Sequence, residues 1–174
     1  MLKKNPDPCS GNLELLGLAF DRVDKKMALR QIQISAQQQE FSYVVTPNVD
    51  HIVQLHKSTD DSLFEAYQGA GTVICDSRIL SYLAQRAGLE LEAVPGSDLT
   101  RDLLQTGKKG WRLAMIGGDP VLHEKLQQLY PDYDWSFHEP PMGIRRDPDA
   151  RLAIAEFVER TMAEVYFFAI GAPQ

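Results

Sequence analysis

Short polar and glycine-containing segments follow the apolar runs of this sequence, and they hold the residues that could do chemistry. In order, they are Thr46-Pro47-Asn48, Asp76-Ser77-Arg78, Pro95-Gly96-Ser97-Asp98, Gly117-Gly118-Asp119 and Gly171-Ala172-Pro173-Gln174. In open parallel sheets, ligands bind outside the carboxyl ends of the strands. Three of these segments also open a predicted helix, where free backbone N–H groups and the helix dipole favour an anion. The pattern therefore indicates a site for a phosphate or diphosphate group.

Asp76 is the acidic residue best placed for catalysis, because it directly follows the buried apolar run 72–75. A carboxylate in such a position is suited to act as a general base. An alternative is that Asp76 only caps the helix predicted from Ser77. Similar alternatives hold for the other candidates: Asn48 could be a helix cap, Arg78 a solvated helix residue, and the glycines at 117 and 118 a plain turn.

No pattern of metal ligands or cofactor-binding residues is present. The two Asp-x-Asp pairs, at 132–134 and 147–149, do not lie at the carboxyl end of a predicted strand, so we interpret them as solvated turns. The four histidines lack ligand spacing, although His51 could line the site or simply pack. Neither a dinucleotide-binding fingerprint nor a P-loop occurs. We therefore predict no metal and no cofactor.

Apolar runs alternate with helical patterns along the whole chain. We expect strands at 13–20, 41–45, 72–75, 111–116, 135–138 and 165–170, and helices at 21–37, 49–56, 62–68, 77–87, 99–105, 120–130 and 148–163. Short, continuous apolar strands are typical of a sheet buried on both faces. This predicts an α/β fold with a Rossmann-like, mainly parallel sheet and helices on both faces. Residues 1–10 are expected to form a flexible arm, and 11–174 a single domain.

Two details of these elements can be compared with a structure. Asp21 is expected to cap the helix at 21–37. The helix at 148–163 is expected to bury Leu152, Ala155, Val158 and Met162 along one side.

Composition narrows the class of protein. The chain has 174 residues and a net charge of -6, which argues against a nucleic-acid partner. Two cysteines in this length fit a reducing compartment, and Cys75 is expected to be a buried thiol. The first residues lack an apolar signal region, and no run reaches the roughly 18 apolar residues of a membrane span. We therefore predict a cytoplasmic location.

Taken in order, the segments resemble the WecG/TagA/CpsF bacterial glycosyltransferases, glycosyltransferase family 26. The resemblance covers nearly the whole chain after residue 10. Besides Asp76, its motifs are Thr46-Pro47-Asn48-Val49-Asp50-His51, Val94-Pro95-Gly96-Ser97-Asp98-Leu99, Ile116-Gly117-Gly118, Pro140-Pro141-Met142-Gly143 and Gly171-Ala172-Pro173-Gln174.

The resemblance implies an inverting, metal-independent transferase. Such an enzyme moves an N-acetylhexosamine-type sugar, such as N-acetylmannosamine, from UDP to a lipid-linked acceptor in the synthesis of cell-surface polysaccharide. It further implies that Asp76 is the base, that Thr46 and Asn48 line the sugar site, and that Gln174 lies in a segment touching the donor. The remaining expected substrate-binding residues are Arg78, Pro95, Gly96, Ser97, Asp98, Gly117, Gly118, Gly143, Gly171 and Pro173.

The chain departs from the family pattern in two places. Ser77 stands where many relatives carry glycine, which suggests an exopolysaccharide-type branch. Relatives also continue beyond the segment at 171–174, and some use a basic tail there for peripheral contact with the membrane. We therefore expect a shortened chain that forms a homo-oligomer. The alternatives are a non-catalytic remnant that binds UDP-sugar, and a nucleotide-using oxidoreductase or hydrolase.

Overall fold

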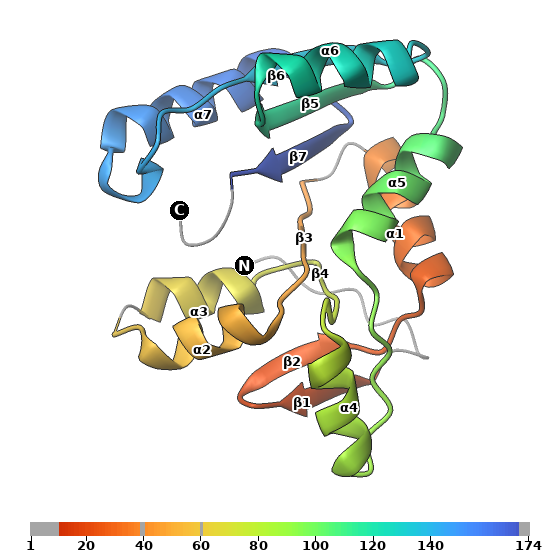
Figure 1. Cartoon of the computed structure of the whole chain (residues 1–174), viewed down its shortest axis with the longest axis vertical. Helices are drawn as coiled ribbons and strands as arrows, with labels where there is room; N and C mark the ends of the chain where they lie inside the picture. The colour runs from red at the N-terminus through yellow and green to blue at the C-terminus, as the bar shows by residue number, and fades with distance from the viewer. Residues whose placement is uncertain (1–10, 39–40, 60, 171–174) are drawn as a thin grey trace. The chain divides into compact units, whose positions relative to one another are not determined.

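A computed structural model describes residues 11–38, 41–59 and 61–170. The chain divides into two compact units, an N-terminal unit that ends at Gln105 and a C-terminal unit that begins at Thr106. Each unit combines parallel strands with helices (Figure 1). The predicted Rossmann-like α/β class is therefore confirmed. The arm predicted at 1–10 lies outside the described residues.

The N-terminal unit opens with an antiparallel hairpin of β1 (Asn12–Leu15) and β2 (Leu18–Asp21). Leu16 and Gly17 form its two-residue turn, with φ angles of 52° and 76°. The prediction of one strand at 13–20 is therefore wrong. A leucine rarely adopts positive φ, so an apolar residue conceals the turn in the sequence.

A short parallel pair, β3 (Val44–Val45) and β4 (Thr72–Val73), forms the centre of this unit. The chain between them holds α2 (Val49–Lys57) and α3 (Asp61–Gln68). Backbone hydrogen bonds extend the pairing beyond the strands, from Ile74 to Val45 at 2.9 Å and from Asp76 to Pro47 at 3.0 Å. The N–H of Val94 donates to the carbonyl of Cys75 at 2.8 Å. Three chain segments therefore run side by side here.

Helices and the hairpin cover both faces of this pair. The hairpin, α2 and α4 (Arg78–Arg86) pack on the face that holds Val73 and Cys75. Figure 1 shows the hairpin beside α4. On the other face, Ile74 packs with residues of α1 (Lys25–Gln38) and α5 (Gly96–Thr106). The apolar run around β4 is buried on both sides, as its composition predicted.

Asp21 does not cap a helix. It is 8% exposed, and its Oδ2 atom accepts a hydrogen bond from the backbone N–H of Val73 at 2.8 Å. The first turn of α1 is instead capped by Asp24, whose Oδ1 atom accepts from the N–H of Met27 at 2.7 Å. The predicted cap is therefore wrong by three positions, because Asp21 has a partner that is distant in the sequence.

The C-terminal unit is a parallel sheet in the order β6-β5-β7, made of β5 (Arg112–Gly117), β6 (Asp134–His138) and β7 (Val165–Ala169). Helix α7 (Pro148–Thr161) packs Phe157 against Ala114 and Ile116 on one face. On the other face, His123 of α6 (Pro120–Leu129) stacks on Phe137. Both faces of this sheet are covered.

The buried side of α7 differs from the prediction. Ala150 and Phe157 are buried, whereas Leu152 is 58% and Met162 is 67% exposed. Of the four residues predicted to face inward, only Val158 packs against the core, and Ala155 is exposed. The rotation that seats the large ring of Phe157 on the sheet turns Leu152 and Met162 outward.

Candidate functional site

Three expected site residues of the N-terminal unit lie together at the ends of the parallel segments. Thr46 follows β3, Asp76 follows β4, and Gly96 begins α5. The Oδ2 atom of Asp76 accepts a hydrogen bond from the N–H of Gly96 at 3.2 Å. A Cβ atom at position 96 would lie 3.0 Å from Thr46 Oγ1 and 3.5 Å from Asp76 Oδ2. A side chain at this position would require Thr46 to move by a few tenths of an ångström, so glycine favours this close approach of the backbone.

Asp76 does not cap α4, so the capping alternative for this residue is wrong. The cap is Ser77, whose Oγ atom accepts from the N–H of Leu80 at 3.2 Å. The Asp76 side chain is half-buried, and among the described residues only Gly96 donates a hydrogen bond to its carboxylate. A carboxylate held in this way keeps acceptor capacity, which a general base requires.

Asn48 caps α2, which is one of the roles that the sequence left open for it. Its Oδ1 atom accepts from the N–H of His51 at 3.2 Å, while its own N–H donates to His51 Nδ1 at 3.2 Å. This reciprocal pair is a capping box at the start of α2. His51 is thereby fixed as part of a helix cap, and the amide nitrogen of Asn48 is the group left to meet a ligand.

The segment at 95–98 forms the first turn of α5. The carbonyl of Pro95 accepts from the N–H groups of Asp98 and Leu99, both at 3.0 Å. The side chain of Asp98 pairs with Arg101, and Ser97 is exposed. Within this segment, Gly96 lies close to both Thr46 and Asp76.

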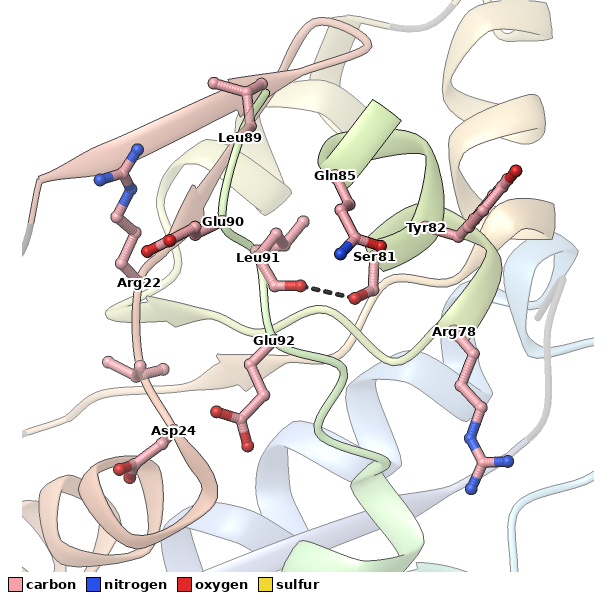
Figure 2. Close-up of a pocket in the computed structure, with 11 residues that line it drawn as sticks. Arg22, Asp24, Arg78, Ser81, Tyr82, Gln85, Leu89, Glu90, Leu91 and Glu92 are labelled. Carbon is pink, nitrogen blue, oxygen red and sulfur yellow. Dashed lines mark hydrogen bonds between the residues drawn. The ribbon is translucent and has the colours of Figure 1, made fainter. Parts of the chain in front are cut away.

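Arg78 is exposed and lines a surface groove of the same unit. The groove has a volume of about 590 Å³ and is lined by Arg22, Val23, Asp24, Arg78, Ser81, Tyr82, Gln85, Leu89, Glu90, Leu91 and Glu92. Among these residues, Ser81 donates a hydrogen bond to the carbonyl of Leu91 at 2.7 Å (Figure 2). Thr46, Asn48 and Asp76 do not line it, and its charges are mixed in sign. The position of Asp76 after a parallel strand is therefore stronger evidence for the location of the site than this groove is.

The C-terminal unit places a tight glycine turn after its central strand. Gly117 and Gly118 have φ angles of 99° and 80°. A Cβ atom at Gly117 would lie 2.4 Å from the carbonyl oxygen of Ala169, and one at Gly118 would lie 3.0 Å from Leu122 Cδ2. Asp119 caps α6 by accepting from the N–H of Leu122 at 2.7 Å. The positive φ angles and the close packing therefore account for both glycines without a ligand.

The remaining predicted residues are distributed as follows. Gly143 has a φ angle of 85° and begins a 3-10 turn, η1 (Ile144–Arg146), and a Cβ atom added there would meet no atom within 4 Å. Gly171, Pro173 and Gln174 lie outside the described residues. The Asp-x-Asp pairs have structural partners, since Asp132 pairs with Lys109 at 2.7 Å and Asp147 caps α7. Across 11–38, 41–59 and 61–170, no cluster of three or more His, Cys, Asp or Glu residues could hold a metal ion.

Sequence reasoning missed a buried histidine below the glycine turn. His123 is 7% exposed, and its Nε2 atom lies 2.9 Å from the carbonyl oxygen of Gly117. The sequence signal for His123 was its position near the start of the helix that follows the two glycines.

Comparison with known proteins decides the family. Residues 13–174 match the model of the glycosyl transferase WecG/TagA/CpsF family. The chain belongs to this family. A search of curated proteins gives no significant match. Membership in the WecG/TagA/CpsF family supports a glycosyltransferase role, with a sugar donor and an acceptor. In the described part of the chain, no helix has both the length and the apolar character needed to cross a membrane.

Proposed function

We propose that this protein is an inverting, metal-independent glycosyltransferase that transfers an N-acetylmannosamine-like sugar from UDP to a lipid-linked acceptor. The observation that carries the proposal is the Asp76 carboxylate. It follows a parallel strand, takes no part in capping α4, and lies beside Thr46 and Gly96. Family membership supports the reaction class, and the sequence resemblance suggests the donor and the acceptor.

In the proposed reaction, Asp76 removes the proton from the acceptor hydroxyl group. The hydroxyl oxygen attacks the anomeric carbon from the face opposite UDP, and the bond from that carbon to the diphosphate oxygen breaks. The electron pair leaves with UDP, and the sugar configuration inverts. Thr46 and the amide nitrogen of Asn48 would hydrogen-bond the sugar.

The leaving diphosphate needs stabilisation of its developing charge. We assign this role to the start of α6, where Gly118 is exposed and no described residue accepts a hydrogen bond from its N–H. Fixed N–H dipoles at a helix start stabilise an anion without reorganisation. This supports a metal-independent reaction.

Calorimetric titration with UDP tests the proposal. We expect UDP to bind in the presence of EDTA, and added manganese to leave the dissociation constant within about twofold. Loss of binding in EDTA with recovery in manganese would contradict the metal-independent mechanism. Asp76→Asn is the matched variant, because it should bind UDP as the wild type does while losing turnover. UDP binding without any turnover by the wild type would favour a non-catalytic binding protein.

A further inference from the structure

His123 of α6 is held against the glycine turn by a hydrogen bond whose direction is fixed. Its Nε2 atom lies 2.9 Å from the carbonyl oxygen of Gly117. A carbonyl oxygen can only accept, so Nε2 carries the proton and donates. Because the histidine is 7% exposed, solvent hardly competes for this bond.

The rest of the imidazole ring is also held in place. Its Nδ1 atom lies 3.5 Å from Oε1 of Glu139, which directly follows β6. The ring stacks on Phe137, with centroids 4.1 Å apart and planes inclined by 19°. His123 therefore connects the segments that follow β5 and β6.

The fixed carbonyl determines where the next N–H points. The carbonyl of Gly117 and the N–H of Gly118 belong to one planar trans peptide, so they point in opposite directions. Since the carbonyl is turned toward the buried ring, the N–H is turned away from it. Gly118 is exposed, and no described residue accepts a hydrogen bond from its N–H.

The turn leaves little room for another arrangement. A Cβ atom at Gly118 would lie 3.2 Å from His123 Nε2, so the ring and the turn are already in close contact. Glycine has a wide range of backbone conformations, and two in succession would otherwise allow this peptide to rotate. The hydrogen bond from His123 selects one orientation.

We propose that His123 is a positioning residue that orients the Gly118 N–H toward the diphosphate of the nucleotide donor. The inference rests on the proposed function for its ligand. Its structural half, the orientation of the Gly117–Gly118 peptide by His123, can be measured without any ligand.

Two variants of similar size separate the hydrogen bond from the stacking. In His123→Gln the side-chain amide nitrogen reaches the position of Nε2 and can still donate to Gly117. In His123→Asn it falls short, and both variants lose the ring. We expect the dissociation constant for UDP to rise about tenfold in His123→Asn, the scale of one hydrogen bond to a charged group, and less than about threefold in His123→Gln. Both should lower the melting temperature through loss of the ring, and His123→Asn should lower it further because it also loses the buried hydrogen bond to Gly117.

Nuclear magnetic resonance supplies the second readout. In the wild type we expect His123 to be protonated at Nε2. Because both variants lose the ring and only His123→Asn also loses the hydrogen bond, we expect the Gly118 amide resonance to move further in His123→Asn than in His123→Gln. An Nε2 atom without a proton would overturn the inference, even if a variant failed to fold. Equal UDP affinities of the two variants would also overturn it. If the wild type bound no UDP, the proposed function would fail, while the Gly118 resonance would still decide the structural half.

Discussion

The carboxylate of Asp76 accepts the N–H of Gly96, twenty positions later in the chain, at 3.2 Å. Asp76 thus accepts a backbone N–H group in the first turn of α5, whereas its neighbour Ser77 caps α4. The candidate base is therefore held by a backbone group of α5, and not by α4, the helix that follows it in the chain. The candidate catalytic role and the helix cap therefore fall on two adjacent residues, Asp76 and Ser77, which makes the two roles testable one at a time.

Replacing Asp76 by Asn should remove the base and keep the fold. The amide oxygen of Asn can still accept from Gly96, so circular dichroism and melting temperature should stay near those of the wild type. Turnover in a transferase assay should fall about 10²–10⁴-fold, the usual scale for general base catalysis. Ser77→Ala is the control, and it should cost about 1 kcal/mol of stability through loss of the cap. Near-normal turnover by Asp76→Asn would contradict the assignment.

Gly96→Ala should impair activity more than stability. Its methyl group would lie 3.0 Å from Thr46 Oγ1 and 3.5 Å from Asp76 Oδ2, so Thr46 must move by a few tenths of an ångström. We expect turnover to fall at least about tenfold, because small displacements of catalytic groups are costly. Gly11→Ala, with no atom within 4 Å of the added methyl group, is the control. Equal activities of the two variants, measured side by side, would show that this approach has no functional role.

Gly117→Ala and Gly110→Ala separate steric clash from backbone strain. Both glycines have positive φ angles, 99° and 81°, so each substitution should cost about 1–2 kcal/mol. At position 117 the methyl group would also lie 2.4 Å from the carbonyl oxygen of Ala169, whereas position 110 is open. Denaturant unfolding should therefore show a clearly larger loss for Gly117→Ala. Equal losses would mean that β7 can move away from the turn without cost.

Cys75 should resist alkylation in the folded protein. It is 1% exposed, and burial raises the pKa of its thiol, which lowers the fraction of reactive thiolate at neutral pH. Peptide mapping after iodoacetamide treatment should find Cys75 unmodified in the native protein and modified in denaturant. Rapid native modification would show that the segment after β4 opens readily.

The sequence predicted the fold class and the edge of the sheet that holds Thr46 and Asp76. Both follow from the alternation of apolar strands and helices, which is a local pattern. It could not decide between Asp76 and Ser77 as the cap of α4, because both residue types cap helices well. The deciding contact is Gly96, and local sequence does not report a contact across twenty positions.

The missed features share this cause. Asp21 looked like a cap because its partner, the N–H of Val73, is 52 positions away. His123 looked like an ordinary helix residue because the carbonyl that it binds is brought to it by the turn at Gly117. The hairpin turn at Leu16 was hidden for a different reason, since its first residue is one that seldom adopts a left-handed conformation.

The bond from Val73 to Asp21 has a consequence for association between chains. On the side of β4 away from β3, the N–H of Val73 would otherwise be open to pairing with another strand. The buried carboxylate of Asp21 accepts a hydrogen bond from this N–H. The nearby carbonyl of Cys75 accepts one from the N–H of Val94. An added strand would have to displace both bonds and would meet an inward-pointing charge. Asp21 and Val94 thus occupy these two backbone groups, so this side of β4 offers neither of them to a strand of another chain.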